Sequence, residues 1–162
     1  GRIPQFVKKD AHPENWLIDD HGKLTMIDFE SRKPLPAIFE VVQLIDDYPL
    51  LPATHDGWRD RMALCDEYLT TVSSLSNSPR PVDASTTDAL YGCFAILRGA
   101  FGLIRASRKK IKLTSSSALR SKGIRVTHHH DVLVYLSRNH GVEGVRALAS
   151  TVLAEVGAIV PV

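Results

Sequence analysis

The chain has 162 residues and a formal net charge of +2, with 44% hydrophobic and 23% charged residues, as in one globular domain or part of a larger one. This composition excludes a disordered, collagen-like or disulfide-scaffold protein. No apolar run is long enough to cross a bilayer and no cleavable signal opens the chain, so we expect no membrane span. The two cysteines, Cys65 and Cys93, lack metal-site spacing, which excludes a cysteine-based zinc site and favours a reduced, cytoplasmic protein.

The charge is unevenly distributed along the chain. Most of the acidic residues lie between Asp10 and Glu67, whereas the segment from Ala89 to His130 has basic residues and no acidic one. Such a division could direct ligands of opposite charge to different parts of the protein. Two solvated surfaces that partly neutralise each other are the simpler interpretation, which we prefer.

The first 35 residues are predicted to form strands and tight loops. Short apolar runs at Trp16–Ile18 and Leu24–Ile27 flank the turn sequence Asp19–Lys23, which has Gly22 near its end. This pattern predicts a β-hairpin.

From Pro36 onward the apolar residues recur at helical spacing. Pro36 suits the first turn of a helix that runs through Ile45. Asp56 is the expected N-cap of a second helix, which ends near Leu75. The sequence Asn77–Pro81 should then form a stiff linker.

A third helix is expected after Ser85–Asp88, which resembles a capping box. One side of this helix should face the core with Leu90, Phe94, Leu97, Phe101 and Ile104. Two more helices follow Thr127 and Val142, with Gly141 and Gly157 as stops. The basic, serine-rich residues 107–125 are expected to form a loop or a frayed helix end. We therefore expect an α+β, mostly α fold, in which a short hairpin within residues 1–35 precedes a helical bundle of residues 36–162 in the same lobe.

The hairpin brings together polar residues from two segments. Pairing of Trp16 with Ile27 sets Asn15 opposite Asp28, about 4.5–5.5 Å away at Cα. An amide oxygen and a carboxylate that converge on one point suit Mg²⁺. Asp10, on the preceding loop, could accept the proton of a hydroxyl, which completes the parts that phosphoryl transfer needs.

These residues also carry a resemblance. Asp10-x-His12-Pro13-x-Asn15 followed by Ile27-Asp28-Phe29-Glu30 resembles the catalytic and metal-binding segments of the aminoglycoside phosphotransferase family, which is similar to choline and fructosamine kinases. The resemblance is strong from Asp10 to Glu30 and weaker from Ala37 to Leu44, where the family has an aromatic-Asp-Leu-Ala pattern. It implies the C-terminal lobe of a kinase-like fold and an ATP-dependent phosphotransferase that acts on a small-molecule hydroxyl.

Carried over by position, the resemblance makes Asp10 the catalytic base. It makes Asn15 and Asp28 the ligands of the Mg²⁺ that bridges the nucleotide phosphates, with Glu30 beside them or on a second metal ion. Residues that would shape or steady this catalytic loop are Lys8, His12 and Glu40.

Three positions depart from the family pattern. Lys8 and Lys9 stand where His and Gly usually precede the catalytic Asp, and Glu40 stands in place of an Asp. Two cations would keep Asp10 ionised and attract phosphate. The same departures are compatible with an alternative, a non-catalytic kinase-like binding or regulatory module or a pseudokinase. A protein kinase is disfavoured because no Gly follows Asp28-Phe29.

The family also has a nucleotide-binding lobe and further helices before its catalytic loop, for which the residues before Asp10 are too few. The chain is therefore expected to be a C-terminal lobe that works with an N-terminal lobe from the same gene or from a second chain. It should expose apolar surface that those parts cover.

Acidic residues follow the metal segment, where the family builds its acceptor pocket. Asp46, Asp47 and Asp56 are candidates for binding a cationic acceptor such as an aminosugar. Helix capping and surface solvation explain the same residues equally well, and both interpretations stay open at this point.

Two further patterns have simpler explanations. The run His128-His129-His130 is typical of a metal site. However, consecutive helical residues point about 100° apart and cannot all face one ion. We therefore expect exposed histidines at a helix start. The basic segment Arg108–Lys112 lacks the interleaved aromatic residues of single-strand binding proteins. A solvated loop is expected there, and nucleic acid is not an expected partner.

Overall fold

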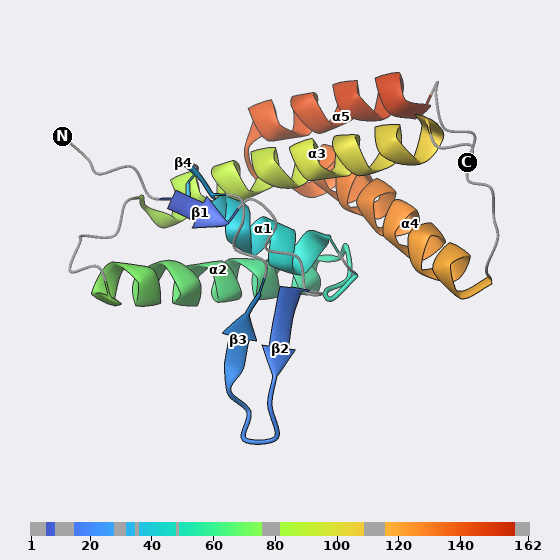
Figure 1. Cartoon of the computed structure of the whole chain (residues 1–162). Helices are drawn as coiled ribbons and strands as arrows, with labels where there is room; N and C mark the ends of the chain where they lie inside the picture. The colour runs from blue at the N-terminus through green and yellow to red at the C-terminus, as the bar shows by residue number, and fades with distance from the viewer. Residues whose placement is uncertain are drawn as a thin grey trace.

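A computed structural model describes the backbone of residues 6–8, 15–27, 32–34, 36–47, 49–75, 82–108 and 116–157. Within these residues four short strands precede five helices (Figure 1). The strands are β1 (Phe6–Lys8), β2 (Trp16–Ile18), β3 (Leu24–Met26) and β4 (Arg32–Pro34). The helices are α1 (Ile38–Asp46), α2 (His55–Leu75), α3 (Ala84–Arg108), α4 (Ser116–Asn139) and α5 (Glu143–Gly157). The predicted mostly helical fold with a small β component is thus confirmed.

The strands form two separate antiparallel pairs, β1 with β4 and β2 with β3. The β2–β3 hairpin is present as predicted, but Trp16 pairs with Met26, so the predicted register is wrong by one residue. The turn sets this register: Gly22 has a φ of 77°, and the Asp19 carboxylate accepts hydrogen bonds from the backbone N–H groups of His21 and Lys23, both at 2.9 Å. A slip of one residue exchanges the two faces of a strand.

Helices α2 and α3 begin at side-chain caps other than the expected ones, whereas α1 has no side-chain cap. Thr54 caps α2, since its Oγ1 accepts a hydrogen bond from Gly57 N at 3.2 Å, and Asp56 lies inside the first turn. Asp83 caps α3 by accepting from Thr86 N at 2.8 Å. Both are the usual N-cap geometry, in which a side-chain oxygen satisfies a free N–H of the first turn.

The prediction for residues 107–125 is wrong for much of the segment, because α4 already begins at Ser116. The histidine run therefore lies well inside a helix. His128 and His129 are buried, contrary to the expected exposed helix start. The linker predicted at Asn77–Pro81 lies outside the described residues.

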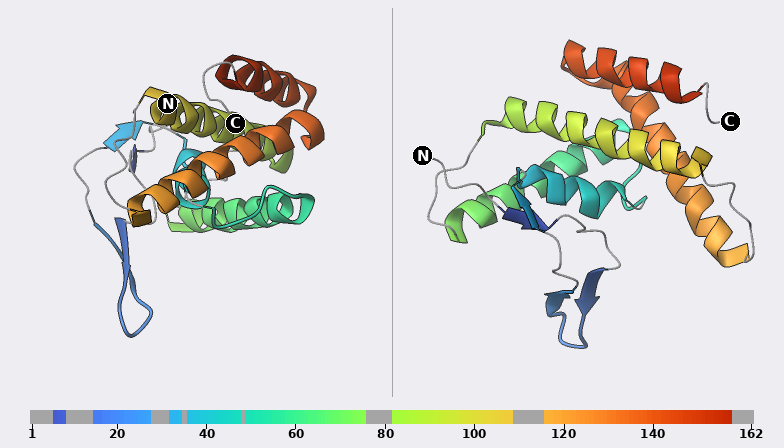
Figure 2. Two further views of the ribbon diagram at one scale, coloured as in Figure 1. Left: turned by 90° about the vertical axis from the view of Figure 1, so that its right-hand side faces the viewer. Right: turned by 45° about the horizontal axis from the view of Figure 1, so that its top comes forward.

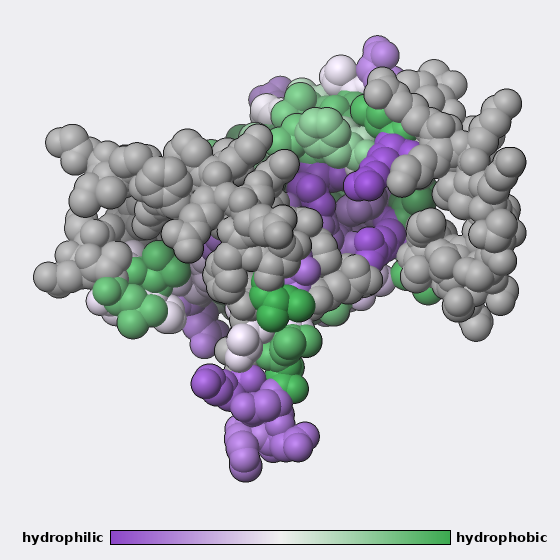
Figure 3. All heavy atoms as spheres, in the orientation of Figure 1, coloured by the Kyte–Doolittle hydropathy of each residue, from purple (hydrophilic) through white to green (hydrophobic). Residues whose placement is uncertain are grey.

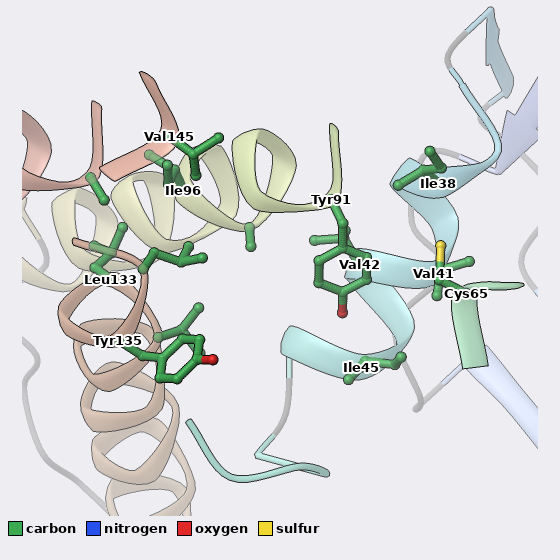
Figure 4. Close-up of a cluster of buried hydrophobic side chains, with 14 of the residues drawn as sticks. Ile38, Val41, Val42, Ile45, Cys65, Tyr91, Ile96, Leu133, Tyr135 and Val145 are labelled. Atoms are coloured by element: carbon green, nitrogen blue, oxygen red, sulfur yellow. The ribbon is translucent and has the colours of Figure 1, made fainter. Parts of the chain in front are cut away.

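Helix α3 is central in the bundle and contacts α1, α4 and α5 (Figure 2). The buried side chains that join these helices are shown in Figure 4 and include Val42, Tyr91, Ile96, Leu133 and Val145. The core face predicted for α3 is only partly right. Leu97 and Phe101 are 43% and 59% exposed, because α3 turns Tyr91, Ala95, Ile96 and Leu103 toward its neighbours instead.

By length and composition alone, residues 84–106 of α3 could cross a membrane. Central helices of bundles can have the same length and composition, so this one helix is weak evidence for a membrane span.

Candidate functional site

The two segments that carry the predicted catalytic motifs connect the same two pieces of structure. Residues 9–14 lead from β1 to β2, and residues 28–31 lead from β3 to β4. At one end, Lys8 of β1 is paired with Arg32 of β4. At the other end, the backbone N–H of Ile27 donates to the carbonyl of Asn15 at 2.8 Å. Each segment is therefore flanked by the same two residue pairs, Lys8 with Arg32 and Asn15 with Ile27.

Several predicted site residues, namely Asp10, His12, Asp28 and Glu30, lie outside the described residues. Of the predicted metal ligands, Asn15 is described and is buried at 8% exposure, directly before β2. It lies opposite Ile27, and not opposite Asp28 as the expected register required. Within the described residues, no group of three or more His, Cys, Asp or Glu side chains could hold a metal ion.

Glu40 lies in the first turn of α1, two residues after the helix begins. It is half-buried and accepts a hydrogen bond from the Tyr68 hydroxyl of α2. Burial, reinforced by the Glu40 carboxylate, raises the pKa of Tyr68 well above its usual range. The pair keeps Tyr68 a neutral donor and ties the start of α1, next to β1 (Figure 1), to α2.

A buried polar cluster joins four helices through the carboxylate of Asp46, at the end of α1. Arg61 of α2 donates to Asp46 Oδ1 from Nε at 3.0 Å and from Nη2 at 2.7 Å. Tyr91 of α3 donates to Oδ2 at 2.8 Å, and His128 Nε2 of α4 lies 3.1 Å from Oδ1. Burial by itself raises the pKa of Asp46, but the contacts with His128 and Arg61 outweigh it and hold that pKa below its usual value.

Arg61 also shapes the connection between α1 and α2. Its Nη1 donates to the carbonyls of Pro52 at 2.7 Å and Gly57 at 3.0 Å, and its Nη2 donates to the carbonyl of Leu51 at 2.9 Å. The side chain is fully buried. Arg61 was not among the predicted site residues, although it lies on the same helical stripe as the buried Gly57, Cys65 and Leu69.

A second ion pair lies beside this cluster. Arg98 of α3 donates to both carboxylate oxygens of Asp47, which is 7% exposed. Asp46 and Asp47 are therefore ion-pair residues of the bundle and not the acceptor-binding carboxylates suggested by the sequence, because their oxygens are buried and bonded. Asp56 is exposed and forms an ion pair with Arg59 at 3.1 Å.

His129 points about 100° away from His128 around α4, and the centroids of the two rings are 6.1 Å apart. Its ring packs on Gly102 of α3, where an added Cβ would come within 2.3 Å of His129 Cδ2. Burial, helped by the neighbouring His128 and Arg98, lowers the pKa of His129 to about 4. His128, His129 and His130 thus face different surroundings, as the helical geometry requires.

A groove lies between the α1–α2 connection and α4. Its volume is about 1030 Å³, and its walls come from residues 49–54 and from one face of α4 between Ile124 and Asn139. Nothing in the sequence pattern pointed to it, because it depends on how α4 crosses the connection.

No family model, curated protein or solved structure matches this chain.

Proposed function

We propose that the chain is the C-terminal lobe of an ATP-dependent, cytoplasmic small-molecule kinase of the aminoglycoside phosphotransferase type. One observation carries the proposal: the two motif segments are held at both ends by paired residues, Lys8 with Arg32 and Asn15 with Ile27. Residues distant in sequence that must act on one phosphoryl group need such a frame.

In this proposal, Asp10 accepts the proton of the acceptor hydroxyl while that oxygen forms a bond to the γ-phosphorus, and ADP leaves. Asn15 and Asp28, with Glu30, would hold Mg²⁺. Their amide and carboxylate oxygens are ligands of the kind that Mg²⁺ prefers, and the buried position of Asn15 fits a residue held in one orientation. When bound, the metal would neutralise charge on the nucleotide phosphates.

The hairpin supports the presence of a second lobe. It projects away from the helices (Figure 1), and Leu17 and Ile18 of β2 are 53% and 72% exposed. In the space-filling view the tip of the hairpin is hydrophilic, and hydrophobic atoms lie above it (Figure 3). Because an isolated two-stranded hairpin is marginally stable in water, an N-terminal nucleotide-binding lobe that covers Leu17 and Ile18 would stabilise it.

The acceptor would be a small molecule with a hydroxyl group. A cationic acceptor would rely on Asp56 and its exposed neighbours, because Asp46 and Asp47 are buried in ion pairs, whereas Asp56 stays exposed beside Arg59. The alternative is a non-catalytic kinase-like module. The non-catalytic alternative is favoured by Lys8, which replaces the usual His. Lys8 lies opposite a second cationic residue, Arg32, in the β1–β4 pair.

The test uses the longest polypeptide in which this segment occurs. ADP release would be measured with Mg-ATP over a panel of aminosugars and other alcohols, and nucleotide binding by calorimetry. Asp10→Asn should abolish transfer but leave Mg-ATP binding, and Asp28→Asn should weaken both. The matched control is Asp20→Asn, at the exposed hairpin tip, which should change neither. Transfer at the wild-type rate in Asp10→Asn would refute the assignment, and Mg-dependent nucleotide binding without turnover on any acceptor would favour the module.

A further inference from the structure

Helix α4 packs against α3 and α5 on one side, and its His128 and Tyr135 contact Asp46 of α1 and Trp58 of α2. Val132, Leu133 and Leu136 are buried where α4 meets α3 and α5. Beside His128, Tyr135 and Asn139, the groove described above is lined from α4 by Ile124, Thr127, Asp131, Val134 and Arg138. These positions are separated by three or four residues, which is the spacing of a face that contacts another helix. We call this set of five residues the α4 stripe.

Across the groove, the α4 stripe faces residues 49–54 of the α1–α2 connection. Ile124 and Leu50, on opposite walls, are 48% and 56% exposed. The N-terminal end of α4 also extends beyond the other helices (Figures 1 and 2). Apolar side chains in a concave, unfilled surface of this kind indicate a docking surface.

The groove is preformed, which lowers the entropic cost of filling it. Arg61 holds the carbonyls of Leu51 and Pro52 in the connection at 2.9 Å and 2.7 Å. Pro52 also lies so close to Gly57 that an added Cβ at Gly57 would be 2.0 Å from its carbonyl oxygen. The wall opposite α4 therefore has little freedom to close over the groove.

The charges of the α4 stripe are self-complementary. Asp131 and Arg138 are seven residues apart, about 10.5 Å along the helix. Arg138 has no ion pair with any described residue, and Asp131 has only a 3.6 Å contact with the adjacent His130. Consider a second copy of α4 that lies antiparallel to the first, with a two-fold axis near Val134. Asp131 of each helix then lies next to Arg138 of the partner helix. Two ion pairs would therefore flank the apolar contact between the Val134 side chains. An isologous dimer needs this kind of self-matching surface.

We propose that the chain forms a two-fold symmetric dimer through the α4 stripe, with each α4 lying in the groove of the other protomer. The stripe from Ile124 to Arg138 is about 21 Å long, which is short for an obligate interface. The dimer is therefore in equilibrium with monomer at micromolar concentration. This inference does not depend on the proposed function.

Sedimentation equilibrium on the chain, over a roughly hundredfold range of concentration, tests the proposal. Wild type should be a dimer at the upper end. Asp131→Arg should raise the dissociation constant at least about tenfold, because two attractive pairs become two repulsive ones. Arg138→Asp should do the same, and the double charge exchange D131R/R138D should restore the constant to within about threefold. Circular dichroism would confirm that each variant is folded.

Two controls locate the interface. Asp60→Arg makes the same charge change on the exposed surface of α2 and should leave dimerisation unchanged. In a Cys93→Ser background, Val134→Cys should form an intermolecular disulfide, whereas Thr127→Cys should not, since the antiparallel arrangement separates the two copies by about 22 Å along the axis. A chain that stays monomeric at every concentration overturns the proposal. A dimer unaffected by Asp131→Arg, or one linked equally well through Thr127→Cys, also overturns it.

Discussion

Replacing Arg61 with Met should be the most destabilising single change in the bundle. Arg61 is fully buried and donates to Asp46 and to three backbone carbonyls. Met has similar length and fills the space, but it donates no hydrogen bond. Among the described residues, the change would leave the buried Asp46 carboxylate with Tyr91 and His128 as its partners.

Removal of one partner from a buried ion pair costs about 3–5 kcal/mol, because the remaining charge is desolvated without compensation. The freed carbonyls of Leu51 and Pro52 add to this cost. Since small domains are stable by only about 5–15 kcal/mol, Arg61→Met should remove a large part of the free energy of unfolding.

The free energy of unfolding would be measured by urea denaturation, followed by far-UV circular dichroism. Arg59→Met, two residues away on the same helix, is the matched control: Arg59 is 73% exposed, and its ion pair should contribute about 0–1 kcal/mol. The double variant with Asp46→Asn should be less destabilised than the sum of the single variants. A loss below about 1 kcal/mol in Arg61→Met would show that the buried cluster does not stabilise the bundle.

Other predictions concern backbone contact and pH. Gly57→Ala should destabilise by about 1–3 kcal/mol, because its Cβ would lie 2.0 Å from the Pro52 carbonyl oxygen. Gly144→Ala, where no atom lies within 4 Å, should stabilise by about 0.4–1 kcal/mol; equal urea midpoints for the two variants would contradict the close approach. The pKa of His129 is lowered from 6.5 to about 4 in the folded state, so the unfolded state binds more protons between these values and stability falls as the pH drops from about 6.5 to 4. His129→Gln should flatten that part of the pH–stability curve, and an unchanged slope would show that His129 is not its source.

Most helices could be predicted because their apolar residues recur at helical spacing over long stretches. The boundaries could not, because Thr54 and Asp83 compete with nearby residues that cap equally well in sequence terms. The α3 face was only partly predictable. Leu97 and Phe101 match the helical period, yet contacts with α1, α4 and α5 place a different face of α3 in the core.

In the candidate site, too, some features could be predicted from the sequence and others could not. The motif around Asp10, Asn15 and Asp28 is local in sequence and could be found by its spacing. The register that sets Asn15 opposite Ile27 depends on the turn formed by Asp19 and Gly22. A pattern of alternating residues does not choose between registers one residue apart when both place apolar residues in the strand.

The sequence by itself determined the helical class, the hairpin and the order of the motif segments, since each follows from short-range periodicity and turn chemistry. Only the tertiary structure decided the roles of Asp46, Asp47 and the histidine run. In sequence, the acidic residues fitted a site for a cationic acceptor or a solvated surface, and the histidines an exposed cluster. In the structure, Asp46 meets Arg61, Tyr91 and His128 from three other helices. A buried charge is stable only where such partners converge, and that convergence is a property of helix packing.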